Sequence, residues 1–283
     1  MLNFITWTTN PIAFTLGSLH VYWYGILVAT GFMLSYLVFN NIYKTEGLRT
    51  EDADYAAFGL SIATIIGLRL GHCFFYEASF YLAHPIEILK VWKGGLASHG
   101  GTLGIIIFTL IYTYRRKINL LWLLDRLAVC VLIAASLVRI GNLMNSEIYG
   151  CETTLPWGFI FAREGETLPH HPTQIYESLF YLINFVILYI YYKNTKGHIA
   201  AGRTTGFLLT SVFTFRFCIE FIKNNQVDFE EDMLLNMGQL LSIPFILCGI
   251  ALLIYSFLHP TYPTGKSQKE IKNKSLNNNT KNN

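Results

Sequence analysis

The sequence is short of charge. Only 14% of its 283 residues are charged, against about 25% in an ordinary globular protein, while 52% are hydrophobic. Such a chain lacks the polar side chains that would cover one or two water-soluble domains. Its net charge of +3 is too small to indicate nucleic-acid binding. The composition therefore predicts a membrane protein that binds no nucleic acid.

Familiar chemical signatures are also missing. Four of the five cysteines fall within apolar stretches and Cys151 stands alone, so no disulfide framework can be proposed. The sequence has no CxxC and no HExxH, which removes the usual spacings of a metal site. Ser98 does not lie in a G-x-S-x-G nucleophile elbow. We therefore expect neither a metal ion nor one of these common hydrolase sites.

Long apolar runs are what the sequence has in abundance. A helix needs about 20 apolar residues to cross a bilayer core of about 30 Å, and seven stretches come close to that length. Because these runs are apolar on every side, they do not show the alternation of an outer-membrane β-barrel. The sequence thus predicts an all-α, polytopic membrane protein with seven transmembrane helices. The predicted helices are Val21–Phe39, Tyr55–Tyr76, Leu96–Tyr114, Leu120–Val138, Ile175–Tyr192, Thr205–Ile222 and Gly238–Leu258.

The basic residues predict the orientation. Lys and Arg gather in the first, third and fifth connections and in the C-terminal tail, and such segments stay in the cytoplasm. The N-terminus is then outside. Residues 1–20 have no basic side chain and no A-x-A cleavage site, so we expect them to be retained. Residues 1–258 form the predicted transmembrane domain, and the Lys/Asn-rich residues 259–283 a disordered cytoplasmic tail.

Charged residues within the predicted spans mark a pathway, a paired contact or a site. In this topology Arg69, Arg216 and Glu220 lie in the outer half of the membrane, whereas Asp125 and Arg126 lie in the inner half, where their role stays open. Arg216 and Glu220, four residues apart, could equally form an ordinary pair within one helix. Arg69 has no carboxylate in its own helix, so its partner must come from elsewhere, and an anionic ligand could be that partner.

Two polar segments accompany these charges at the outer side. KGGLASHGG, residues 93–101, places glycines on both sides of His99, which allows another backbone or a ligand to approach closely. The same histidine could also be a packing residue. VRIGNLMNSEIYG, residues 138–150, contains Arg139, Asn142 and Glu147, and a guanidinium can grip a phosphate with two parallel hydrogen bonds. These residues could instead cap a helix and order the following connection.

At this point the residues resemble the motifs of bacterial prolipoprotein diacylglyceryl transferases, in order along residues 15–258. The segments that carry the resemblance are LHVYWYG (19–25), GLRLGHCFFY (67–76), VWKGGLASHGG (91–101), RIGNLMNSE (139–147), HPTQIYE (171–177), RFCIEF (216–221) and GQLLSIP (238–244). One motif would be a weak signal, but seven in sequence are specific.

The resemblance implies a multi-pass enzyme of the bacterial cytoplasmic (inner) membrane. It implies transfer of diacylglyceryl from the membrane lipid phosphatidylglycerol to the lipobox cysteine of a preprolipoprotein signal peptide, leaving glycerol phosphate and a thioether. No metal or soluble cofactor is implied. By motif match the catalytic residues are Tyr24, His99, Arg139 and Arg216, and the substrate-binding residues are Arg69, Gly100, Gly101, Arg139, Asn142, Glu147 and Glu220.

The expected chemistry follows from the side chains. Because a free thiol has a pKa of about 8.5 and histidine one of about 6.5, His99 is the expected acceptor of the thiol proton. Arg139 and Arg216, with Arg69, would hold the phosphate and balance its charge as the carbon–oxygen bond breaks. Glu147 and Glu220 would position the arginines, Asn142 would orient the headgroup, and Tyr24 could donate to a phosphate oxygen.

The chain departs from the family pattern at four positions, Lys93, Val138, Leu143 and His170. These departures bear on headgroup preference and on the outer connection. A transporter or channel is the competing interpretation of intramembrane Arg and Glu, but no internal repeat is visible and the charged residues lie off the midplane. An intramembrane peptidase would need a Ser/His or paired-Asp arrangement within the helices, which the sequence lacks.

Overall fold

The computed structural model describes residues 4–90, 94–95, 97–224 and 234–265. Contacts divide the chain into two compact units, one formed by residues 1–39 and 124–263 and the other by residues 40–123 and 264–283. Helices α1 and α5 contribute to both units, because the division falls within them. Each unit is described by itself.

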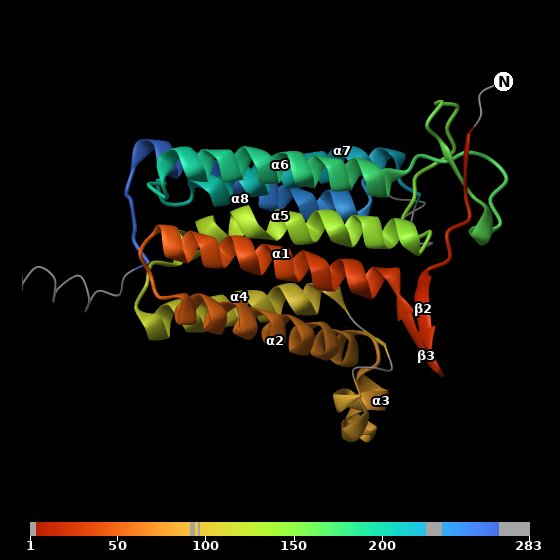
Figure 1. Cartoon of the computed structure of the whole chain (residues 1–283), viewed down its shortest axis with the longest axis horizontal. Helices are drawn as coiled ribbons and strands as arrows, with labels where there is room; N and C mark the ends of the chain where they lie inside the picture. Colours follow the sequence, from red (N-terminus) through yellow and green to blue (C-terminus); the bar gives the residue numbers. More distant parts are fainter. Residues whose placement is uncertain (1–3, 91–93, 96, 225–233, 266–283) are drawn as a thin grey trace, which may run out of the picture. The chain divides into compact units, whose positions relative to one another are not determined.

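The first unit is built from long helices that run along a common direction (Figure 1). They are most of α1 (Trp23–Thr45) and α5 (Leu120–Met144), and all of α6 (Thr173–Thr195), α7 (Arg203–Ile219) and α8 (Met237–Leu258). Small residues let these helices approach closely, as is common in membrane bundles. A Cβ on Gly31 of α1 would lie 2.9 Å from the Ala134 backbone of α5, and one on Gly206 of α7 would lie 2.9 Å from the backbone of Gly249 in α8.

The second unit is an antiparallel helix pair with a short excursion between the two helices. It contains α2 (Thr50–Phe75), α3 (Ala78–Ala83), the 3₁₀ helix η1 (Pro85–Leu89) and α4 (Ser98–Arg116). The pair is held by glycines on both helices. A Cβ on Gly71 of α2 would lie 2.7 Å from Gly100 of α4, and one on Gly67 would also clash with that backbone. Glycine is therefore needed on both sides of this crossing.

The helix prediction is confirmed in its coarser part. The structure is mostly helical, and six of its helices are long and apolar enough to cross a membrane, namely α1, α2, α5, α6, α7 with its 3₁₀ extension, and α8. Helix α4, the third predicted span, is not in this set, because polar residues near its start and the arginines at its end lower its hydropathy. Several helices are longer than predicted; α5 continues to Met144, so Arg139 and Asn142 lie inside it rather than after it.

The all-α prediction fits the structure, whose described residues add only four short strands, three of them near the N-terminus. Strand β2 (Ile12–Leu16) pairs antiparallel with β3 (Leu19–Tyr22), so the first predicted helix begins at Trp23 rather than at Val21. Gly17, with a φ of 60°, forms part of the tight turn between them. Strand β1 (Ile5–Trp7) pairs in parallel with β4 (Phe159–Phe161). Strands this short carry too little periodicity for a sequence pattern to detect.

A buried carboxylate fixes the end of the first unit where α7 begins, which is the inner end in the predicted topology. Asp125 of α5 is fully buried and accepts hydrogen bonds from the backbone N–H groups of Gly202 and Thr205 and from the hydroxyls of Thr204 and Thr205. It thereby caps the first turn of α7 from another helix, where a negative charge also complements the helix dipole. Its neighbour Arg126 donates to the carbonyl of Gly197 at 2.7 Å. The inner pair whose role the sequence left open therefore anchors the connection between α6 and α7.

Two predictions from the sequence fall partly on residues that are not described. Most of the predicted disordered tail, residues 266–283, lies outside the described residues, as does the departure at Lys93. The described start of the tail contacts the connection between α6 and α7: the N–H of Ala201 donates to the carbonyl of Thr261, and the ring of Tyr262 stacks on that of His198 at 4.5 Å.

We predict that Asp125→Asn destabilises the protein by about 3 kcal/mol, because it turns one buried acceptor into a donor that faces other donors. The free energy of unfolding of the purified protein in detergent tests this. Glu51→Gln, on an exposed residue of α2, is the matched control and should leave stability unchanged. Equal stability of the Asp125 variant and the wild type would contradict the capping role.

Candidate active site

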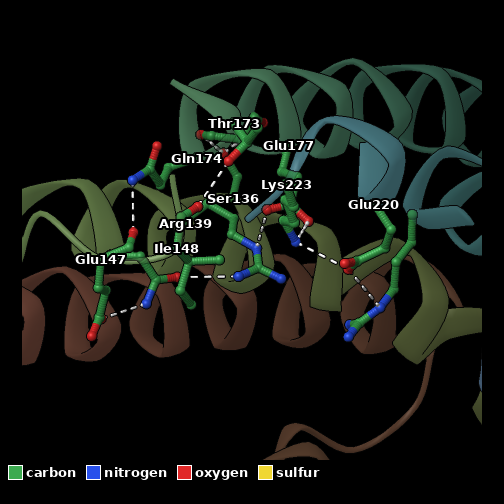
Figure 2. A network of polar contacts seen from close by, with 12 residues as sticks. Ser136, Arg139, Glu147, Ile148, Thr173, Gln174, Glu177, Glu220 and Lys223 are labelled. Carbon is green, nitrogen blue, oxygen red and sulfur yellow. Dashed lines mark hydrogen bonds and ion pairs between the residues drawn. The ribbon is translucent and has the colours of Figure 1, made fainter. Parts of the chain in front are cut away.

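One fully buried carboxylate organises the polar side chains where α5 and α7 end and α6 begins, which is the outer end of the first unit in the predicted topology. Glu177 of α6 has no exposed side-chain surface, and its Oε2 lies 3.0 Å from Nε of Arg139 in α5. Its Oε1 lies 3.2 Å from Nζ of Lys223, a residue that follows the short 3₁₀ helix η4 (Glu220–Ile222). Figure 2 shows the three side chains pointing toward one another. The two cations together compensate the burial of the carboxylate.

A second carboxylate extends this contact toward α7. Oε1 of Glu220 lies 3.2 Å from the same Lys223 ammonium and 3.9 Å from Nε of Arg216. Its Oε2 accepts a hydrogen bond from the side-chain amide of Asn236 at 3.2 Å. A Cβ on Gly238 would lie 2.7 Å from the Glu220 carboxyl carbon, so a larger residue there would displace this carboxylate. Glu220 is thus held from three sides.

Arg139 and Arg216 differ in the exposure of their side chains and in their contacts with described residues. The Arg139 side chain is 15% exposed and donates to Asn142 in addition to its pair with Glu177. Arg216 is 38% exposed, and Glu220, at 3.9 Å, is the one described carboxylate within ion-pair distance of it. The ion pair within one helix that the sequence left open therefore exists but is long. Among the described residues, Glu220 is the one ion-pair partner of Arg216, and the exposed part of the guanidinium has N–H donors that suit an anion.

The signature segment after Arg139 forms a chain of hydrogen bonds. Nη1 of Arg139 donates to Oδ1 of Asn142 at 3.3 Å, and Nδ2 of Asn142 donates to Oε1 of Glu147 at 2.7 Å. Asn145 donates to the same carboxylate oxygen at 3.2 Å. The predicted positioning of Arg139 by Glu147 is therefore indirect and passes through Asn142. The carboxylate that touches Arg139 directly is Glu177.

The backbone on both sides of Glu147 is strained. Ser146 and Ile148 have φ angles of 58° and 61°, in the left-handed region that a β-branched residue rarely adopts. Such residues cost about 1–3 kcal/mol each. The strain is held by α6: the Gln174 side chain donates to the Glu147 carbonyl at 2.6 Å, and the Thr173 hydroxyl donates to the Ile148 carbonyl at 2.8 Å (Figure 2).

Tyr24 reaches the same helix face from α1. A Cβ on Gly141 would lie 2.8 Å from the Tyr24 ring, so the ring packs where α5 has no side chain. Gly141 stands between Arg139 and Asn142 in the sequence. Glycine at this position therefore lets the tyrosine ring pack against α5 beside the signature residues.

His99 belongs to the other unit and lies in the first turn of α4. Its ring is exposed and packs edge-on against Phe75 at 5.8 Å and tilted against Tyr76 at 5.7 Å. Gly100 and Gly101, which follow it, face α2: a Cβ on Gly100 would meet the backbone of Gly67 and Gly71, and one on Gly101 would lie 2.8 Å from Leu68. The glycines therefore have a packing role, while their contact with substrate stays a prediction.

The hydrogen-bond acceptors of Arg69 lie within its own unit. Nε donates to the carbonyl of Ile88 at 2.9 Å, Nη1 to that of Gly94 at 2.6 Å, and Nη2 to that of Glu87 at 2.6 Å. The guanidinium also lies 5.0 Å from the centroid of the Tyr81 ring. Because backbone carbonyls satisfy it and only 3% of the residue is exposed, Arg69 needs no anionic ligand to be buried. It holds the segment that leads from α3 toward α4.

Residues of the connection between α5 and α6 pack against one end of the first unit. Two of the departures from the family pattern, Leu143 and His170, make contacts there. Leu143 packs with Phe159 and Phe161, and the N–H of the Trp7 indole donates to its carbonyl at 3.0 Å. The imidazole of His170 lies 2.9 Å from the carbonyl of Gly150 and 3.1 Å from Glu166. Both residues therefore stabilise the outer connection.

The Glu166 carboxylate contacts two neighbours, Tyr149 and His170. Its Oε1 accepts a hydrogen bond from the Tyr149 hydroxyl at 2.7 Å. That hydrogen bond, opposed by desolvation, holds the pKa of Glu166 below its usual range, with His170 contributing in the same direction. Burial and the Glu166 carboxylate raise the pKa of Tyr149 to about 12. Burial, and next to it the charge of His170, lower the pKa of His171. Tyr149 therefore stays protonated and Glu166 ionised near neutral pH.

The predicted site residues divide between the two units. The first unit holds Tyr24, Arg139, Asn142, Glu147, Arg216 and Glu220, and the second unit holds His99, Arg69, Gly100 and Gly101. Direct contacts connect Arg139 with Asn142 and Glu147, and Arg216 with Glu220. The approach of His99 to these arginines stays a prediction.

Sequence reasoning missed two charged residues of the site. The sequence analysis singles out neither Lys223, whose side chain is 3% exposed, nor Glu177, whose side chain is fully buried. The HPTQIYE segment was the available signal, because Thr173, Gln174 and Glu177 all lie in it. Spacing along that helix could not identify Arg139 as the partner.

Comparisons with known proteins agree with the motifs. The family described as prolipoprotein diacylglyceryl transferase matches residues 11–255. The chain is 43% identical over 257 residues to a protein of Chloroherpeton thalassium, which covers 90% of this chain and 95% of the relative. It is 44% identical over 251 residues to one of Tolumonas auensis, with 88% and 96% covered. Both relatives carry the name phosphatidylglycerol–prolipoprotein diacylglyceryl transferase.

We predict that Arg69→Met makes the amides of η1 exchange with solvent at least about tenfold faster, because their carbonyls lose the guanidinium that holds the segment in place. Hydrogen exchange of peptides covering residues 85–90 measures this. Arg115→Met, on an exposed arginine at the end of α4, is the control. Unchanged exchange in the Arg69 variant would favour the anion-binding role expected from the sequence.

Proposed function

Because the chain belongs to the prolipoprotein diacylglyceryl transferase family, we propose that it transfers the diacylglyceryl group of phosphatidylglycerol to the lipobox cysteine thiol of preprolipoproteins. The observation that carries this proposal in the structure is the row of charged groups at the outer end of the first unit. Arg216 ends that row with a side chain that is 38% exposed, which suits a phosphodiester that must bind and leave.

The membrane arrangement belongs to the same proposal. The six candidate spans and α4 as a seventh give an odd number of crossings, with the N-terminus outside and the tail in the cytoplasm. Helix α4 pairs along its length with α2, and this partner supports a span that is too polar to be identified by hydropathy alone. The site then faces the outer leaflet of the bacterial cytoplasmic membrane, where lipid and signal peptide can both enter laterally.

The reaction breaks one bond and forms another. The cysteine sulfur attacks the glyceryl carbon that carries the phosphate ester, the carbon–oxygen bond breaks with its electron pair going to oxygen, and glycerol phosphate leaves. His99 accepts the thiol proton, which makes the sulfur the more nucleophilic thiolate. Phe75 and Tyr76 pack on its ring and hold its orientation. The reaction uses no metal or soluble cofactor in this proposal.

The arginines stabilise the leaving group. Arg216 and Arg139 neutralise the charge that develops on the phosphate, an effect that is larger away from bulk water. Glu220 and Glu177 hold the two guanidinium groups in place. Asn142, whose amide contacts both Arg139 and Glu147, accepts a hydrogen bond from Nη1 of Arg139 and so positions that end of the guanidinium. Tyr24, packed on Gly141 of the same helix, donates from its hydroxyl to a phosphate oxygen.

Membranes or detergent micelles that contain the purified protein, labelled phosphatidylglycerol and a lipobox peptide test the proposal. We expect the peptide cysteine to gain the mass of a diacylglyceryl group and glycerol phosphate to appear in equal amount. A peptide in which serine replaces the lipobox cysteine is the control and should gain nothing. Peptide cleavage without mass gain, or no product, would contradict the proposal.

We predict that Arg139→Lys lowers kcat/KM at least about a hundredfold although it keeps the charge, because an ammonium cannot reproduce the planar fork of the guanidinium. Arg163→Lys, on an arginine of the outer connection that donates to the Thr9 carbonyl, is the matched control. Full transfer activity of the Arg139 variant would remove the phosphate-binding role.

We predict that His99→Asn lowers kcat at least about a hundredfold without unfolding the protein, because the thiol proton loses its acceptor. Initial rates between pH 6 and 8 and a thermal unfolding curve measure the two effects. His84→Asn, an exposed histidine of the same unit, should behave as the wild type. Rates in the His99 variant equal to those of the wild type over this pH range would place the base elsewhere.

A further inference from the structure

Lys223 is fixed in space by its backbone as well as by its side chain. It directly follows the short 3₁₀ helix η4 and forms an isolated antiparallel β-bridge with Gly150. The carbonyl of the preceding Ile222 accepts a hydrogen bond from the N–H of Cys151 at 2.8 Å. A lysine is seldom buried to 3% exposure unless its charge is paired. Here the ammonium has two carboxylate partners, Glu177 and Glu220, each at 3.2 Å.

The two contacts place Lys223 at the centre of an alternating row of charges. In order, the row is Arg139, Glu177, Lys223, Glu220 and Arg216. Three cations and two carboxylates leave one net positive charge. Without the lysine the row would separate into two neutral ion pairs, with nothing between the carboxylates to offset their repulsion.

Both arginines depend on this row for their position. Glu177 orients Arg139 and Glu220 orients Arg216, and Lys223 is the one described residue that contacts both carboxylates. The two arginines come from different helices, α5 and α7. A change at the lysine would therefore alter the spacing between two guanidinium groups that it does not itself touch.

We propose that Lys223 is the positioning residue that couples Arg139 to Arg216 and gives this row of five described residues one net positive charge that favours a singly charged phosphodiester. This inference rests on the proposed function. Lys223 does not contact the substrate in this arrangement, because its buried ammonium is directed at the two carboxylates. Its loss should weaken recognition of the anionic lipid and leave recognition of the peptide unchanged.

Steady-state kinetics of the full-length protein in mixed micelles of phosphatidylglycerol, with a lipobox peptide as acceptor, test the proposal. Lys223→Met removes charge and donors at similar length, Lys223→Gln removes the charge but keeps N–H donors, and Lys223→Arg keeps both. Lys193→Met, on an exposed lysine at the inner end of α6, is the matched control. Thermal unfolding of each variant is measured alongside, and Lys223→Gln decides the result if the Met variant does not fold.

We expect Lys223→Gln and a folded Lys223→Met to raise KM for phosphatidylglycerol at least about tenfold and to change KM for the peptide less than about twofold. Lys223→Arg should restore the lipid KM to within about threefold of the wild type. The proposal is overturned if the neutral variants keep a normal lipid KM, if both KM values rise together, or if the arginine variant recovers stability but not lipid KM. Absence of transfer by the wild type would instead refute the proposed function.

Discussion

The burial of the Glu177 carboxylate is the constraint on which the outer end of the first unit depends. An isolated carboxylate with no exposed surface is destabilising by several kcal/mol, and removal of one partner from a buried pair costs about 3–5 kcal/mol. Glu177 therefore requires Arg139 and Lys223 together. These cations come from α5 and from the turn after α7, so satisfying one charge fixes three segments of the chain. The position of Arg139 follows from this requirement rather than from local helix geometry.

The inner end of the same unit uses the same physical device for a different purpose. Asp125 is as deeply buried as Glu177, but its partners are backbone amides and hydroxyls at the start of α7. A carboxylate that faces only neutral donors stabilises structure and leaves no cation available for a ligand. The partners of Glu177 are the cations Arg139 and Lys223, and Arg216, which pairs with the neighbouring Glu220, remains partly exposed. The nature of the partners thus separates a structural anchor from a candidate binding site.

The sequence was sufficient for the helices and insufficient for these pairings. A run of about 20 apolar residues indicates a span, and the ends of the predicted spans differ from those of the observed helices by up to six residues. Glu177 and Lys223 are 46 residues apart, and no periodicity connects an acidic residue on one helix to a lysine after another. Arg69 shows the same limit: its partners are backbone carbonyls, which carry no identity in a sequence and led us to expect an anionic ligand instead.

The strained turn around Glu147 shows how helix α6 supports both the charge of Arg139 and its geometry. Left-handed backbone at Ser146 and Ile148 persists only where neighbouring groups outweigh its cost, and two hydrogen bonds from Thr173 and Gln174 supply that support. One turn further along the same helix, Glu177 pairs with Arg139. The first turns of α6 therefore hold both ends of the hydrogen-bond series that runs from Arg139 through Asn142 to Glu147. Because each end is held by a separate contact, Asn142 has little freedom to move, and the Arg139 guanidinium is held in one orientation, as the proposed phosphate-binding role requires.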